Sequence, residues 1–292
     1  MLPTHVDAEI TSQPATWRQA AELLPTVAGA LPAPGERVAV VGCGTSWFIA
    51  MSYAVLREGA GHGVTDAFVG SEYPGSREYD RVVAISRSGT TTEIVELLAA
   101  LRPAATTLIT AVEGSPAAAV AAATIELPFA DERSVVQTRF ATTTLALLRA
   151  HLGDDIDAVA RDGEEALAIP LDGLAAAEQV TFLGRGWTVG LAYEAALKTR
   201  EAAQFWAEAY PGMDYRHGPI AIAQPGRLVW SLGPAPEGLP DEVSATGATY
   251  VEHDLDPQAG LIVAQRFAVA LAKERGLDPD RPRALTRSVI LA

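Results

Sequence analysis

The segment Val82-Val83-Ala84-Ile85-Ser86-Arg87-Ser88-Gly89-Thr90-Thr91 is the strongest structural signal in this 292-residue chain. Its apolar first half predicts a buried strand, and a helical pattern begins directly after its last threonine. A loop that joins a strand to a helix N-terminus presents free N–H groups and the positive end of the helix dipole to one point. The hydroxyl groups of the loop can add further donors. The segment therefore predicts a binding loop for the phosphate of a small molecule, with an ordinary Ser/Thr helix cap as the alternative.

Apolar strands alternate with helical patterns on both sides of this segment. This alternation predicts an α/β fold in which a parallel sheet is covered by helices on both faces. In the first half, strands are expected over Arg37–Val41, Val64–Val69, Arg81–Ile85, Thr106–Thr110 and Thr124–Leu127. Helices are expected over Ala15–Ala30, Ser46–Glu58, Thr91–Ala100 and Val135–His151.

The pattern starts again in the second half of the chain. Gly42-Cys43-Gly44 and Gly184-Arg185-Gly186 lie 142 residues apart, and each follows an apolar run and precedes a helical pattern. The repeat predicts two copies of one α/β unit, 1–152 and 153–292, which meet at the acidic stretch 153–157. Further strands are expected over 227–231 and 249–252 and a last helix over 257–275, whereas 206–219 shows no periodicity and is expected to be a functional loop.

The two Gly-X-Gly loops also suggest dinucleotide binding. That fingerprint needs a third glycine three residues after the second, and Trp47 and Val189 stand at these positions. A strand-ending acid at the required distance is missing as well. NAD binding is therefore the weaker interpretation of both loops, and Thr45 and Ser46 are expected to add donors to the phosphate site or to cap their helix.

The charge and composition of the chain exclude several classes of partner and site. The formal net charge of −14 disfavours nucleic acids and anionic membranes as partners. The sequence shows no run of about 20 apolar residues and no signal peptide, and its single cysteine, Cys43, fits a reducing compartment. The five histidines have no metal-ligand spacing. We expect a cytoplasmic protein without a bound metal.

An acid–base group is expected on the helix that follows the second Gly-X-Gly loop. Glu194, Lys198 and Glu201 lie at i, i+4 and i+7 and thus on one helical face. They form either a solvated stripe with an ordinary ion pair or a partly buried general base with its partners. His217, in the stretch 206–219, is either a proton shuttle or a structural histidine.

Seven motifs in order resemble those of the sugar isomerase (SIS) domain superfamily, above all the isomerase half of the glutamine–fructose-6-phosphate aminotransferases and stand-alone relatives that isomerise, deaminate or deglycate phosphosugars. The resemblance implies two tandem SIS subdomains, each a doubly wound parallel sheet in three layers. The motifs span nearly the whole chain: Cys43-Gly44-Thr45-Ser46, Ser71-Glu72, 85–91, 183–186, 194–201, 207–210 and Arg216-His217-Gly218-Pro219.

The resemblance also implies a site. A phosphosugar would be held by polar residues of two loops, namely Thr45, Ser46, Ser86, Arg87, Ser88 and Thr91. Glu201 would be the base that moves a proton between C1 and C2 of the open-chain sugar, and Lys198 would support it. His217 would assist ring opening and reach into the site of a partner subunit, which implies a homodimer. No metal or organic cofactor is implied.

Three residues depart from the family pattern. Arg87 stands where the family usually has glutamine, and Gln137 stands where the synthases have serine in a sugar-contacting loop. Arg287 stands where the synthases have a lysine that forms a Schiff base with the ketose. A guanidinium that stays protonated cannot be that nucleophile. Gln137 and Arg287 are nevertheless expected to contact the sugar.

These observations predict a phosphosugar isomerase that transfers a proton between C1 and C2 of a hexose phosphate, with or without loss of ammonia or an amine. Glutamine-dependent amination is not expected, because the sequence shows no glutaminase region and no N-terminal cysteine. A phosphosugar-binding sensor without catalytic activity is the alternative, and an NAD-dependent enzyme is a distant third.

Overall fold

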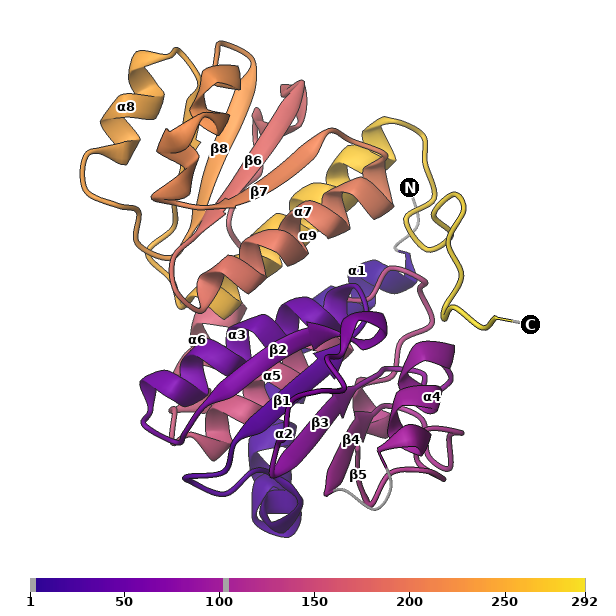
Figure 1. Ribbon diagram of the computed structural model, residues 1–292. Coiled ribbons are helices and arrows are strands. Elements are labelled where there is room, and N and C mark those ends of the chain that lie inside the picture. Colours follow the sequence, from indigo (N-terminus) through magenta and orange to yellow (C-terminus); the bar gives the residue numbers. More distant parts are fainter. Residues whose placement is uncertain (1–3, 102–104, 292) are drawn as a thin grey trace. The chain divides into compact units, whose positions relative to one another are not determined.

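The computed structural model describes residues 4–101 and 105–291, which form two compact units (Figure 1). One unit is built on a five-stranded sheet and the other on a four-stranded sheet. Every strand pair in both sheets is parallel, and helices flank both sheets. The predicted α/β fold with two parallel sheets is therefore confirmed.

The two units are not continuous pieces of the chain. The four-strand unit comprises Met1–Pro14, Arg133–Val136 and Ala158–Leu285, and the five-strand unit comprises Ala15–Glu132, Gln137–Asp157 and Thr286–Ala292. Compared with the expected ranges 1–152 and 153–292, the two ends of the chain have changed units. At the N-terminus the cause is visible, because helix α1 (His5–Thr11) packs on helix α9 (Pro257–Glu274) and is tied to it by the ion pair of Asp7 with Lys273, 2.7 Å long.

The five-stranded sheet has the order β2-β1-β3-β4-β5. The chain leaves β1 toward β2 on one side and returns to β3 on the other side. The carboxyl ends of β1 and β3 therefore flank the position at which the strand order reverses, and this is where open α/β sheets bind ligands. All five strands lie within about one residue of the expected ranges: β1 Val38–Gly42, β2 Thr65–Val69, β3 Arg81–Ile85, β4 Thr106–Thr110 and β5 Ala123–Glu126.

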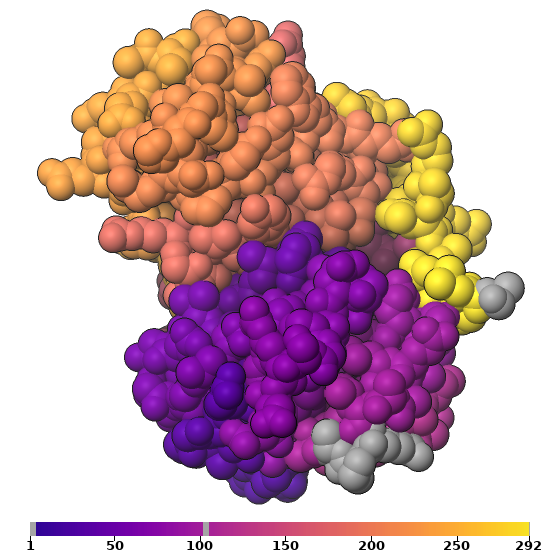
Figure 2. Space-filling view, viewed as in Figure 1, coloured from indigo at the N-terminus to yellow at the C-terminus, as the bar shows by residue number. Residues whose placement is uncertain are grey.

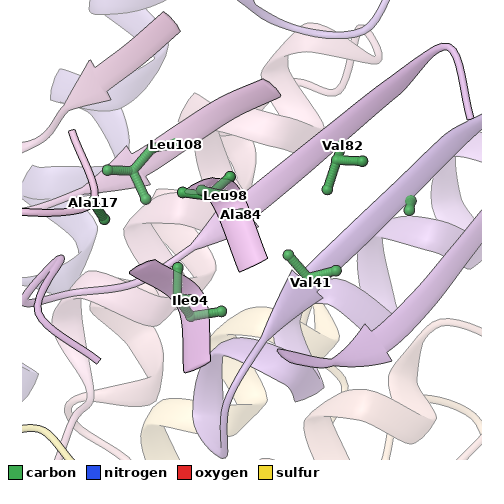
Figure 3. Packing of buried hydrophobic residues seen from close by; sticks show 8 residues of the cluster. Val41, Val82, Ala84, Ile94, Leu98, Leu108 and Ala117 are labelled. Atoms are coloured by element: carbon green, nitrogen blue, oxygen red, sulfur yellow. The ribbon is translucent and has the colours of Figure 1, made fainter. Parts of the chain in front are cut away.

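Helices cover both faces of this sheet. Side chains alternate along a strand, so Val41, Val82 and Leu108 share one face, where they pack with Ile94 and Leu98 of helix α4 (Figure 3). In the same unit, α3 packs on β1 and β2 and against α5. The indole N–H of Trp17, in α2, donates a hydrogen bond of 2.9 Å to the hydroxyl of Thr142, in α5. The bounds are α2 Gln13–Val27, α3 Thr45–Gly59, α4 Thr92–Ala100 and α5 Arg139–His151.

The four-stranded sheet has the order β7-β6-β8-β9 and the same reversal, here between β6 and β8. Helices α7 and α9 lie side by side on one face (Figure 1), where Trp230 packs against Phe182 and Phe267. Leu183 and Val229 on the opposite face pack with residues of α8. The bounds are β6 Gln179–Gly184, β7 Ala207–Pro211, β8 Arg227–Leu232, β9 Thr249–Val251, α6 Ile156–Ala166, α7 Thr188–Ala203 and α8 Leu239–Ala245.

The stretch 206–219 is not the irregular loop that the sequence suggested. It contains strand β7 and two short 3-10 helices, Asp214–His217 and Pro219–Ile222. The repeat accounts for the strand, because the pair Val38–Thr65 of β1 and β2 recurs as Val180–Ala207 of β6 and β7, each residue 142 positions later. The internal duplication therefore extends to the register of the first strand pair.

Three helices were not expected, namely α1, α6 and α8, and α5 begins at Arg139 rather than at residue 135. The late start of α5 has a local cause. The carboxylate of Glu132 accepts hydrogen bonds from the N–H groups of Thr138, Arg139 and Phe140, at 2.6, 2.7 and 3.2 Å. These groups belong to the unpaired first turn of a helix, so Glu132 fixes where that turn begins.

Candidate functional site

The hydroxyl loop, Ser86–Thr91, joins β3 to α4 at the strand reversal of the five-stranded sheet. The side chains of Ser86 and Ser88 are buried, and each Oγ accepts a hydrogen bond of 3.2 Å from a loop N–H, of Gly89 and Thr90 respectively. These bonds use acceptor positions of the hydroxyls, so the O–H groups keep a proton to donate. The arrangement suits a bound anion.

Gly89 gives the hydroxyl loop its shape. Its φ of 60° lies in the left-handed region, and a Cβ at this position would lie 2.1 Å from Oγ of Ser115. Only glycine satisfies both conditions without a shift of the surrounding atoms. The loop can therefore turn tightly against Ser115.

Thr45 and Ser46 begin α3, directly after β1, and both are buried. Because β1 and β3 are neighbours, this turn and the hydroxyl loop lie at the same edge of the sheet. Within the described residues, neither α3 nor α4 has a side-chain hydrogen bond at its N-cap, which is Gly44 in α3 and Thr91 in α4. The hydroxyl groups are thus not used for ordinary capping.

Glu132 and Arg87 form a buried ion pair beside the hydroxyl loop. Their side chains are 0% and 5% exposed, and Nη1 of Arg87 lies 3.6 Å from Oε2 of Glu132. Sequence reasoning noticed Arg87 but missed Glu132. A signal was present, since a carboxylate a few residues before a helix is a common partner of its first N–H groups.

Gln137 and Arg287 belong to the same unit as the hydroxyl loop. Nε2 of Gln137 is buried and makes no hydrogen bond within residues 4–101 and 105–291, which leaves a donor for a ligand. The Arg287 guanidinium instead pairs with the carboxylate of Asp131 and donates to the main-chain carbonyl of Glu132. Both terminal nitrogens of this guanidinium, Nη1 and Nη2, are therefore already bound to protein groups.

The acid–base group lies on α7 in the four-strand unit. Lys198 is 1% exposed; its Nζ pairs with the carboxylate of Glu201 and lies 3.7 Å from Oε1 of Glu194, which is itself fully buried. The three side chains share one helical face, as their spacing predicts. The cluster is not the solvated stripe that was one of the two interpretations, because burial excludes water from most of it.

Glu201 faces a surface cleft of about 430 Å³ in the same unit. Gln204, at the C-cap of α7, and Ala284 also line this cleft, and they are the two non-glycine residues with positive φ among the described residues, at 50° and 61°. Strained backbone of this kind gathers at functional sites more often than elsewhere. The Glu201 side chain is therefore reached from solvent through this cleft.

His217 ends the short 3-10 helix after β7 and is exposed. Cys43 lies beside the core of the five-strand unit, where burial and the nearby Glu93 raise the pKa of its thiol. A protonated thiol is a poor nucleophile, which agrees with a packing role.

Residues 4–101 and 105–291 contain neither a metal-binding cluster nor a helix that could span a membrane. No three His, Cys, Asp or Glu side chains are grouped so that they could hold a metal ion. None of the helices described there has both the length and the apolar character that crossing a membrane requires.

Comparisons with known proteins agree with this architecture. No family model matches the chain. The glutamine–fructose-6-phosphate aminotransferase of Sulfurisphaera tokodaii is 30% identical over 294 residues, which cover 87% of this chain and 50% of that protein. The enzyme of the same name from Methanothermobacter thermautotrophicus is 29% identical and matches 96% of this chain and 56% of its own length. The chain thus spans about half the length of these curated relatives.

Solved structures match over nearly the full chain. The glucosamine-6-phosphate deaminase of Thermotoga maritima has a TM-score of 0.86 and 25% identity, and the match covers 99% of this chain and 100% of that one. The tagatose-6-phosphate ketose/aldose isomerase of Escherichia coli shares the fold, with a TM-score of 0.80, 20% identity and 97% of each chain covered. With its two parallel sheets and its repeated strand reversal, the chain has the fold of two tandem sugar isomerase (SIS) subdomains, which these solved structures share.

Proposed function

We propose that the protein is a phosphosugar isomerase that transfers a proton between C1 and C2 of a hexose phosphate, with or without release of an amine, and without using glutamine. The observation that carries the proposal is the ammonium of Lys198, buried between the carboxylates of Glu194 and Glu201. An ion pair of this kind is costly to bury and is retained where its charge has a task. The relatives named above act on sugar phosphates, which supports the substrate class.

The phosphate would be bound in the five-strand unit. Thr45, Ser46, Ser86, Ser88 and Thr91 would donate hydrogen bonds to it at the reversal between β1 and β3. The helix dipoles of α3 and α4 would add a positive potential at the same edge of the sheet. This local field is needed because the chain as a whole carries a net charge of −14.

The proton transfer would use α7. Glu201 would remove the proton from one of the two carbons and return it to the other, while Lys198 stabilises the negative charge that develops on the enediolate oxygen. Gln137 would use its unpaired amide N–H to bind a sugar hydroxyl. His217, contributed by a partner subunit of a homodimer, would assist ring opening, and the cytoplasm would supply the substrate.

Arg287 argues against the use of glutamine by this protein. A Schiff base requires a neutral amine, and a guanidinium does not lose its proton in proteins. In this chain the position held by the synthases' lysine has a side chain that is bound to Asp131 and Glu132.

Hydrogen–deuterium exchange into the substrate tests the proposal. The protein is incubated in D₂O with fructose 6-phosphate, glucose 6-phosphate or glucosamine 6-phosphate, and incorporation at C1 or C2 is followed by NMR. Glu201→Gln should lower the exchange rate by about 10²- to 10⁴-fold, as expected for a lost general base. Glu274→Gln, an exposed change on α9, is the matched control and should have no effect.

Two results would separate the alternatives. Tight binding of a sugar phosphate without exchange, unchanged in Glu201→Gln, would support the sensor function and overturn the isomerase. Neither binding nor exchange with any of the three sugars would remove hexose phosphates as the substrate class.

A further inference from the structure

We propose that the two arginines at which the chain departs from the family pattern, Arg87 and Arg287, form one device that fixes the C-terminal tail beside the hydroxyl loop. The tail is defined here as Thr286–Leu291. In this arrangement both arginines are positioning residues, and neither reacts with the sugar. Only the expected effect on sugar phosphate binding rests on the proposed function.

Both arginines bind the same two-residue segment, Asp131-Glu132. Arg87 pairs with the Glu132 carboxylate through Nη1, at 3.6 Å, and donates through Nη2 to the main-chain carbonyl of Arg287, at 3.1 Å. Arg287 pairs with the Asp131 carboxylate and donates to the main-chain carbonyl of Glu132. The contacts close a ring that joins the hydroxyl loop, this segment and the tail, all within the five-strand unit.

Within this ring of contacts, the Glu132 carboxylate is held in one position by hydrogen bonds. It is fully buried and receives hydrogen bonds from Thr138, Arg139 and Phe140 at the N-terminus of α5, including one of 2.8 Å from the Thr138 hydroxyl. Charge-assisted bonds of this kind are short and directional. A guanidinium that pairs with this carboxylate is therefore held in one orientation.

The tail reaches the beginning of α4 from this anchor. Oγ1 of Thr90 lies within hydrogen-bond distance of Oγ of Ser288, at 3.0 Å, and of Oγ of Ser88, at 2.9 Å. The N–H of Thr92 donates to the main-chain carbonyl of Val289 at 3.2 Å. The N–H of Leu291 in turn donates to Oγ1 of Thr92 at 2.9 Å. The tail thus uses the first helical N–H of α4, a group that a phosphate could otherwise bind.

This contact pattern assigns the donors of the loop. With the Thr92 N–H and the Thr90 hydroxyl engaged by the tail, the hydroxyls of Ser86 and Ser88 remain the buried donors of the loop. A tail that detaches would change the number and the direction of the donors around the phosphate. The arginine device therefore acts on substrate affinity through the geometry of the loop.

Few other contacts hold the tail in place. All its residues are exposed except the half-buried Ser288, and the segment lies at the surface (yellow in Figure 2). Exposed backbone hydrogen bonds alone give little protection against local opening. The charged contacts of Arg87 and Arg287 are thus expected to supply most of the free energy that keeps the tail attached.

Amide hydrogen exchange of the peptide that contains the tail tests the device without any sugar present. Three variants are compared with the wild type: Arg287→Lys, which keeps the charge but loses the two-point contact, Arg87→Gln, and the double variant. Each single variant should speed exchange of the Leu291 amide several-fold, because Arg87→Gln breaks a buried ion pair and Arg287→Lys weakens a partly exposed one. The Leu291 amide of the double variant should exchange no faster than that of the faster single variant, because either single substitution already breaks the ring of contacts.

Arg77→Gln is the matched control. Arg77 lies in the same unit and makes an exposed ion pair with Asp66, so its exchange pattern at the tail should equal that of the wild type. Tail exchange in Arg287→Lys at the wild-type rate would overturn the proposal. A double variant whose rate is the product of the two single effects would also overturn it, because the two arginines would then act independently.

Calorimetric titration with glucose 6-phosphate tests the consequence for the site. Arg287→Lys should weaken binding several-fold and raise KM, while kcat for C1/C2 exchange changes little. A released tail with unchanged affinity would refute the positioning role. If the wild type binds no sugar phosphate, the proposed function fails, whereas the exchange measurement still decides whether the arginine device exists.

Discussion

Replacement of Lys198 by methionine tests the buried charge cluster on α7 most directly. Methionine has a similar length but removes the ammonium that lies 3.7 Å from the fully buried Glu194 and pairs with Glu201. Removal of one partner from a buried ion pair costs about 3–5 kcal/mol, because the other charge stays in a poorly solvated site. We expect Lys198→Met to lower the Tm by an amount on the order of 10 °C.

Two further variants isolate the cause. Lys198→Met combined with Glu194→Gln removes both charges and should recover most of the lost stability, since a neutral side chain has a smaller desolvation cost. Lys273→Met changes the other lysine of the chain, whose ion pair with Asp7 is more than a quarter exposed, and should cost less than about 1 kcal/mol.

The loss of stability in Lys198→Met should also depend on pH. Without Lys198, the folded state favours the protonated form of a buried carboxyl and binds more protons than the unfolded state does. By linkage, the stability of Lys198→Met then falls as the pH rises, relative to the wild type. Thermal unfolding followed by tryptophan fluorescence at pH 5 and pH 8 measures this. The reasoning is refuted if Lys198→Met and Lys273→Met lower the Tm equally, or if Glu194→Gln brings no recovery.

Three more predictions concern the loops and the N-terminal helix. Gly89→Ala should lower the free energy of unfolding by roughly 2–4 kcal/mol and weaken sugar phosphate binding, because alanine disfavours a φ of 60° and its Cβ would lie 2.1 Å from Oγ of Ser115. Gly29→Ala, which has open space around its Cβ, is the control and should leave the free energy of unfolding unchanged in the same urea titration. Gly42→Ala and Gly184→Ala should each lower the Tm by a similar large amount, since their Cβ atoms would lie 2.5 and 2.3 Å from backbone atoms of the following helix; a tolerant variant at either position would contradict the equivalence of the two turns. Burial alone would raise the pKa of Asp7, but hydrogen bonds from Lys273 and Thr4 outweigh it and hold the pKa below the ordinary value of 3.8. Stability from Asp7 is therefore complete above that value and is lost as the pH falls through the lowered pKa, so the difference in Tm between wild type and Asp7→Asn should shrink in acid; a difference that stays constant down to about pH 2 would contradict this.

Strong local patterns made most of the fold predictable. The buried strands β1, β3 and β4 are short runs of apolar and β-branched residues, and their positions follow from composition alone. Strand β7, Ala207–Pro211, lies at the edge of its sheet, is mostly half-buried and ends in proline, so its sequence lacks an apolar run. The repeat could have found it, because β2 lies 142 residues earlier in the same register.

The candidate site was predictable where it depends on spacing along one helix. The positions of Glu194, Lys198 and Glu201 fix their common face, but not their burial, which results from the packing of α7 on the sheet and on α9. The role of Glu132 at the beginning of α5 has a local signal in the sequence, but its ion pair with Arg87 of the hydroxyl loop has none. Likewise, the link between Arg87 and Arg287 joins residues 200 positions apart, and no local pattern encodes such a contact.

The exchanged chain ends have a practical consequence for anyone who wishes to dissect this protein. A recombinant fragment that ends near residue 152 would carry the five-stranded sheet without the tail that covers the beginning of α4, and its complement would carry α9 without α1. Each fragment would expose a surface that the other one's terminus normally shields. Split halves should therefore be recovered in good yield only when they are produced together, and a circular permutant that joins the original ends would have to preserve both docked termini.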